Sequence, residues 1–98
     1  MKPSRATFAK ALRRTRHARG LAQEVFDDVS SRTYISALER GLKHPTLPKV
    51  DALAKVLDVH PLTLLALSYG STPMEIEKLL DRVRVESRAV LASASDPA

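Results

Sequence analysis

The side chains that could do chemistry in this chain are mostly cations, and they are concentrated in its first half. Residues 1–49 contain 11 Lys and Arg against 4 Asp and Glu, whereas residues 50–98 contain 5 against 7. A basic segment joined to a mildly acidic one indicates one surface for a polyanion and another surface for something else. Clustered Lys and Arg are what contacts with nucleic-acid phosphates require. Judged from charge alone, the alternative to a nucleic-acid partner is a basic face that is exposed to solvent and binds nothing.

The residue types that carry catalysis or ligate metals are sparse and scattered. There is no cysteine, and His17, His44 and His60 lie in separate segments without the spacing of metal ligands. The sequence has no glycine-rich phosphate loop, nucleophile elbow or paired catalytic carboxylates. We therefore expect no catalytic residues, no metal site and no cofactor, and hence no enzyme.

Length and composition predict one small domain with a short appendage. The chain has 98 residues, of which 44% are hydrophobic and 28% charged, as in an ordinary globular protein. Its apolar residues are mostly Leu, Val and Ala, which favour helices over sheets. No apolar run approaches the ~20 residues that cross a bilayer, and the start of the chain lacks a signal-peptide core. We expect a cytoplasmic protein that does not bind membranes.

Apolar residues recur at helical spacing along the chain, and no segment alternates as a strand does, so the predicted class is all-α. The predicted helices run from Ser4 to about Arg19, from about Ala22 to Asp27, from a cap at Ser30-Ser31 to Gly41, from a cap at Thr46 to Leu57, and from His60-Pro61 through Leu67. The segment 70–73 is the clearest internal boundary. Beyond it we expect a final helix of roughly 18 residues and a frayed tail over 93–98.

Several groups of residues occur in an order that is typical of one family: Arg13 and Arg16, Gly20-Leu21-Ala22-Gln23-Glu24, Tyr34-Ile35-Ser36-Ala37-Leu38-Glu39-Arg40-Gly41, Pro45-Thr46-Leu47, and Leu53-Ala54-Lys55-Val56-Leu57. On these residues the chain resembles the Xre and phage-repressor (Cro/C1-type) helix-turn-helix family. The resemblance covers a little over half of the chain. It implies a five-helix lambda-repressor-like domain over residues 1–70, with a C-terminal helix in 71–98. In that family the third helix enters the major groove of double-stranded DNA, and the second lies across the backbone.

The chain departs from the family pattern between its second and third helices. Gln23 and Ile35 are 12 positions apart in this sequence, about two fewer than is usual in the family. Asp28-Val29-Ser30 also replaces the small or glycine residue that usually stands at the turn. The second helix or the turn must therefore be shortened, which bears on the pose of the recognition helix.

In such a domain the exposed start of the third helix reads base edges, and here it offers Ser31, Arg32, Thr33 and Ser36. Arg32 is the strongest candidate, because its planar guanidinium can bond the O6 and N7 atoms of guanine together. Thr33 could contact a thymine methyl group or donate a hydrogen bond. Ala37 stands where the family often has a longer, base-contacting side chain. The alternative for Arg32 is a solvated surface arginine.

Phosphate contacts are a separate task from base reading. The resemblance implies such contacts from Gln23, at the start of the second helix, and from Arg40 and Lys43, just past the third. Arg19 could add to them. The alternative for Lys10, Arg13 and Arg14 on the first helix is a solvated face, and this is the preferred interpretation for Arg14.

Two further residues have an implied structural role. By the same resemblance, Arg16 and Glu39 form a partly buried ion pair that locks the recognition helix to the first helix. Tyr34 either packs beside Ile35 or presents its hydroxyl to a phosphate, and packing is the preferred interpretation.

The final helix carries an apolar stripe that must be buried somewhere. Its members are Ile76, Leu79, Leu80, Val83, Val90 and Leu91. Because repressors of this type usually bind DNA as two-fold dimers, we expect this stripe to form a homodimer. Packing on its own domain is the alternative, and Ser87 within the stripe argues against a long coiled coil.

The expected function is therefore sequence-specific transcriptional regulation by a homodimer on an inverted-repeat operator, with the protein on the nucleoid when bound to DNA. The main alternative is an antitoxin-type module, in which the last helix grips a different protein and DNA binding serves autoregulation. A restriction–modification controller is a third possibility within the regulator class. A membrane-surface helix is disfavoured, because the polar face of the last helix mixes acids and bases.

Overall fold

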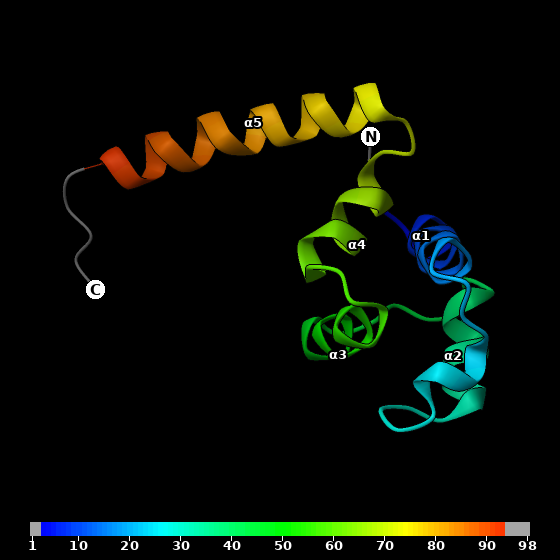
Figure 1. Cartoon of the computed structure of the whole chain (residues 1–98). Coiled ribbons are helices and arrows are strands. Elements are labelled where there is room, and N and C mark those ends of the chain that lie inside the picture. The colour runs from blue at the N-terminus through cyan, green and yellow to red at the C-terminus, as the bar shows by residue number, and fades with distance from the viewer. Residues whose placement is uncertain (1–2, 94–98) are drawn as a thin grey trace.

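The computed structural model describes residues 3–93, and these residues form helices joined by short connections (Figure 1). The elements are α1 (Arg5–Ala18), the 3₁₀ helix η1 (Gln23–Phe26), α2 (Arg32–Glu39), α3 (Leu47–Leu57), α4 (Pro61–Tyr69) and α5 (Pro73–Ala92). Within the described residues there is no strand, so the predicted all-α class is confirmed. The predicted frayed tail lies, from residue 94 onward, outside them.

Side chains at the helix starts fix where each helix begins. Ser4 and Thr72 each form a reciprocal capping box, with Thr7 and Glu75 respectively. Thr46 caps α3 as predicted, through a bond from the backbone N–H of Lys49. These caps satisfy N–H groups that have no partner within their helix, which explains why capping signals locate the boundaries well.

Two further boundaries compare as follows with the sequence-based expectation. Of the pair Ser30-Ser31 predicted to cap α2, Ser31 is the cap, since its hydroxyl accepts from the backbone N–H of Tyr34. The last helix has 20 residues and begins at Pro73, earlier than the apolar stripe suggested. The capping box at Thr72 and the tolerance of proline in a first turn account for this earlier start.

The first four α-helices and η1 enclose one core. Buried side chains from every one of these elements meet there: Phe8, Leu12, Phe26, Ile35, Leu38, Val50, Leu53, Leu57 and Leu64. In Figure 1, α1 and α2 lie on one side of this core and α3 and α4 on the other. α2 is thereby held with one face inward and the other face toward solvent.

The short connection between Gln23 and Ile35 is achieved by shortening the second helix to one 3₁₀ turn. The four residues of η1 are followed by a turn in which the backbone N–H groups of Val29 and Ser30 both donate to the carbonyl of Phe26. A single turn has little packing surface of its own. Phe26, which is completely buried, therefore anchors the whole segment to the core.

α5 projects from the rest of the chain instead of folding back onto it (Figure 1). Ile76 and Leu79, near its start, are half-buried, but the helix contains no fully buried residue. Its second half has exposed apolar side chains, including Val83 at 51% and Val90 at 71% exposure. No helix among residues 3–93 is long and apolar enough to cross a membrane.

We predict that Phe26→Ala lowers the free energy of unfolding by about 3–5 kcal/mol, because it leaves a cavity in the core and frees η1. Urea denaturation measures this change. The control is Leu62→Ala, at a side chain that is 64% exposed, where we expect little change. Equal effects of the two substitutions would contradict the anchoring role.

Candidate nucleic-acid interface

The exposed face of α2 is polar at its N-terminal end. Ser31, Arg32 and Thr33 are exposed and Ser36 is partly so, whereas Ile35, Leu38 and Glu39 face inward. The four residues predicted to read bases thus lie together on one accessible surface, which we call the α2 face. Ala37 is only 7% exposed and adds no side chain to it.

Arg32 is not a free cation. Its Nε and Nη2 atoms each donate to one carboxylate oxygen of Asp27, both at 3.3 Å, and its Nη1 lies 3.9 Å from Glu24 Oε1. The hydrogen bond to Asp27 and the charges of Asp27 and Glu24 raise the pKa of the Arg32 guanidinium. All three side chains are exposed, so water and salt screen their attraction.

α2 is fixed to α1 by a buried ion pair. Arg16 Nε donates to Glu39 Oε2 at 2.7 Å and Arg16 Nη2 donates to Glu39 Oε1 at 2.8 Å, a two-point contact between side chains that are 10% and 3% exposed. Arg16 Nη1 also donates to the carbonyl of Leu21. Gln23 Nε2 donates to Glu39 Oε1 at 3.0 Å, which joins η1 to the pair.

The two charges stabilise each other. The hydrogen bond to Glu39 raises the pKa of Arg16. Burial by itself would raise the pKa of the Glu39 carboxyl, but the bonds from Arg16 and Gln23, with the charge of Arg16, outweigh burial and hold that pKa below its ordinary value. Both groups therefore stay ionised in the folded chain.

Two basic residues have structural contacts that the sequence analysis did not assign. Arg13 Nη1 donates to the backbone carbonyl of Glu39, at the C-terminal end of α2. Lys49 Nζ donates to the carbonyl of Val29 at 2.9 Å and lies 5.3 Å from the ring centre of Tyr34. The i, i+3 spacing of Arg13 and Arg16 places both on one face of α1 and was the available signal for Arg13. No local pattern indicates the contact of Lys49.

The predicted phosphate-binding residues divide into those beside α2 and those elsewhere. Arg40, the C-cap of α2, is exposed, and Lys43 is exposed with its amine 5.6 Å from the ring centre of Tyr34. Tyr34 itself is half-buried and packs against the core. Both cations thus lie just past α2 in the chain, and their contact with phosphates stays a prediction.

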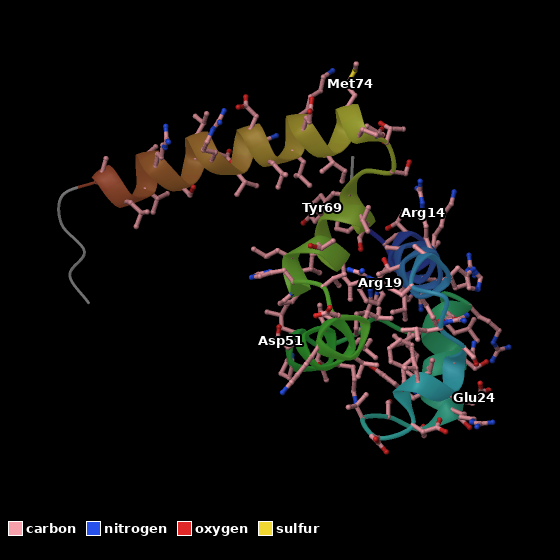
Figure 2. The ribbon with its side chains drawn as sticks, viewed as in Figure 1. Arg14, Arg19, Glu24, Asp51, Tyr69 and Met74 are labelled. Carbon is pink, nitrogen blue, oxygen red and sulfur yellow. The ribbon has the colours of Figure 1, made fainter. Side chains whose placement is uncertain are left out.

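The other two predicted phosphate contacts differ from expectation. Gln23 directs its amide to Glu39, and η1 is too short to develop a helix dipole of useful size, so its side chain serves the ion pair. Arg19 donates to the carbonyl of Asp58 and borders, with Val59 and Ile76, the groove at the root of α5. In Figure 2 the label of Arg19 lies near the middle of the domain, whereas that of Glu24 lies at its lower right. The structure does not bring Arg19 to the α2 face.

No group of three or more His, Asp or Glu side chains within residues 3–93 is placed to hold a metal ion. The histidines have other positions. His60, for example, caps α4 by accepting from the backbone N–H of Leu62 through Nδ1.

We predict that Glu39→Ala lowers the free energy of unfolding by about 3–5 kcal/mol, because it leaves the Arg16 cation buried without its partner. Thermal or urea denaturation followed by circular dichroism tests this. The control is Glu86→Ala, which removes an exposed i, i+4 pair with Arg82 and is expected to change stability by less than about 1 kcal/mol. Normal stability of Glu39→Ala would refute the locking role.

The pair also predicts a pH dependence. The pKa of Glu39 in the folded chain lies below its ordinary value of 4.5, so the stabilisation is complete above that pH and is lost as the pH falls through the folded-state pKa. The stability difference between the wild type and Glu39→Gln should therefore narrow below about pH 4.5. The pKa of Glu75 is also lowered, chiefly by the hydrogen bond from the backbone N–H of Ser71. Its effect on stability is the same in both proteins and therefore does not contribute to the difference. A difference that does not vary with pH would contradict this assignment.

Comparison with known proteins agrees with this arrangement. The helix-turn-helix family, of the Cro/C1 type, matches the chain over residues 10–64, which is more than half of its length. The matched segment begins in α1, contains η1, α2 and α3, and ends in α4. Among curated proteins and among solved structures the chain has no significant match. The chain belongs to the Cro/C1-type helix-turn-helix family and is a DNA-binding transcription regulator.

Proposed function

We propose that the protein acts as a homodimer that binds an inverted-repeat operator, with α2 of each copy in the major groove. The observation that carries this proposal is the α2 face: four hydrogen-bonding side chains at the start of an exposed helix whose other side is locked to α1 by a buried ion pair. Base reading needs donors held in a fixed position, because a loosely held donor gains little discrimination.

The side chains divide between the two tasks of DNA recognition. Ser31, Arg32, Thr33 and Ser36 read base edges, and Arg32 recognises a guanine. Arg40 and Lys43 contact phosphates on either side of the groove and set the register. Neither set is large: α2 has eight residues and spans only about 12 Å. One copy therefore reads only a few base pairs, and a second copy is needed for a longer site.

We propose that residues 1–70 form the DNA-binding domain and that α5, in residues 71–98, joins two copies. At 100° per residue, Ile76, Leu79, Leu80, Val83, Val90 and Leu91 occupy one side of α5, together with Ser87. The stripe begins at the half-buried Ile76 and continues beyond the domain, where the exposure of its side chains increases to 84% at Leu91. Acids and bases both border the stripe, so two copies can meet without a row of like charges.

The direct test is selection from a random duplex library by the purified protein at fixed, near-physiological salt. Salt must be fixed, since the affinity of a basic protein for any DNA falls with a log–log slope of about −0.9 for each neutralised phosphate. We expect enrichment of an inverted repeat with half-sites about 34 Å apart along one face of the duplex. If no sequence is enriched above the salt-dependent background, the proposal is overturned.

The dimer has its own prediction, for which α5 offers a matched pair of variants. Val83 lies in the stripe and Val85 on the opposite side, and they are 51% and 59% exposed. Val83→Glu should increase the monomer fraction and weaken binding to the full inverted repeat by at least about tenfold, because it buries a charge in the dimer interface. Val85→Glu should change neither. Sedimentation velocity and a binding assay on full and half sites measure both effects.

If the wild type is monomeric, or if the two variants behave alike, α5 does not pair with a second copy. The antitoxin-type alternative, in which α5 grips a different protein, would then be the one to pursue by co-purification.

A further inference from the structure

The turn that leads into α2 is acidic, although it adjoins the face that must approach DNA. Glu24, Asp27 and Asp28 are all exposed there. Among the described residues, Arg32 is the cation that forms ion pairs with these carboxylates, namely with Asp27 and Glu24. Carboxylates next to a phosphate backbone weaken binding to every sequence alike. Their presence at this position therefore has to be explained by something other than affinity.

The geometry of Arg32 suggests what Asp27 contributes. A guanidinium has five N–H donors on two usable edges. The side edge, formed by Nε and Nη2, is occupied by the two oxygens of Asp27 at 3.3 Å each. Glu24 Oε1, at 3.9 Å from Nη1, is too far to accept a hydrogen bond. The end edge, which carries one hydrogen of Nη1 and one of Nη2, stays available, and two parallel donors are what guanine O6 and N7 accept.

We propose that Asp27 is a positioning residue that orients the guanidinium of Arg32 for hydrogen bonding to guanine. This inference rests on the function proposed above. Asp27 holds the guanidinium plane at two points, so that less rotational freedom is lost when the end edge meets a base. Its negative charge also offsets part of the charge of Arg32, which makes a phosphate a poorer competing partner for that side chain. Asp27 thus lowers the affinity of the protein for DNA of any sequence and raises its preference for guanine over other bases at one position.

The chain offers a matched control, because Asp28 adjoins Asp27, is also exposed, and has no ion pair within residues 3–93. Replacing either residue by asparagine removes one negative charge from the same turn. Both Asp27→Asn and Asp28→Asn should therefore raise the affinity for random-sequence DNA by a similar factor, about two- to fivefold at low salt. Only Asp27→Asn removes the two-point hold on Arg32.

The experiment uses the full-length protein and the site that it selects. Arg32→Ala first identifies the base pair that Arg32 reads, as the position at which selection is relaxed. The dissociation constant is then measured for the selected site and for a site changed only at that base pair. We expect the preference for guanine to fall about three- to tenfold in Asp27→Asn and to be unchanged in Asp28→Asn. Thermal denaturation verifies that both variants are folded.

Three results would overturn the inference while leaving the proposed function intact. The first is that the base whose selection Arg32→Ala relaxes is not a guanine. The others are that Asp27→Asn keeps the wild-type preference for guanine, or that Asp27→Asn and Asp28→Asn lose this preference equally. The last result would assign the effect to charge and not to positioning. Failure of the wild type to select any sequence is a different outcome. It would overturn the proposed function, and this inference with it.

Discussion

The position of the α2 face depends on the buried contact between Arg16 and Glu39. Glu39 is the last residue of α2, and its two carboxylate oxygens receive three side-chain donors, two from Arg16 and one from Gln23. Burying a charge pair gives a net gain only if the geometry is good and the remaining polar atoms are satisfied. Here Arg16 also bonds the carbonyl of Leu21, and no buried side-chain nitrogen or oxygen in the described part of the chain lacks a partner. The pair therefore fixes the position of α2 relative to α1 at a distance from the residues that we propose to contact DNA.

This arrangement explains how the chain tolerates its short second helix. A longer helix would hold α2 by its own packing surface, but η1 has a single turn. Its place is fixed instead by Phe26 in the core, by Gln23 at the ion pair, and by Lys49 at the carbonyl of Val29. These contacts join η1 and the turn after it to the core, to α2 and to α3. Together they replace the helix–helix packing that the missing residues would have supplied. As a consequence, the amide of Gln23 is bonded to Glu39 within the protein and does not point outward as a phosphate contact would require.

The parts of this structure that were predictable from the sequence are those with local causes. The cap at Thr46, the start of α1 near Ser4, the stop at Gly41 with its φ of +75°, and the apolar periodicity of α1 all depend on neighbours a few positions away. The contacts of Arg19 with Asp58 and of Lys49 with Val29 join residues far apart in the sequence and depend on how the segments meet after folding. The contact of Arg32 with Asp27, five positions apart, depends on the path of the turn between η1 and α2. A surface cation with several acceptors within reach carries no local signal of which one it will use. Arg16 and Glu39 were an exception only because a family pattern supplied the missing long-range information.

The way in which α5 is attached has a consequence for DNA recognition. The connection from α4 is short and well bonded: the N–H groups of Ser71 and Thr72 both donate to Glu75 Oε1, and Arg14 Nη1 donates to the carbonyl of Ser71. Such a connection is not a flexible linker, because its backbone groups are held by both α1 and α5. If two copies pair through α5, the distance and angle between their α2 helices are then set by this connection and not by the DNA. A flexible linker would let one dimer accept several half-site spacings, whereas this rigid one favours a single spacing. Recognition of the operator would thus depend on two rigid couplings in each copy, the ion pair that holds α2 and the bonded connection that holds α5.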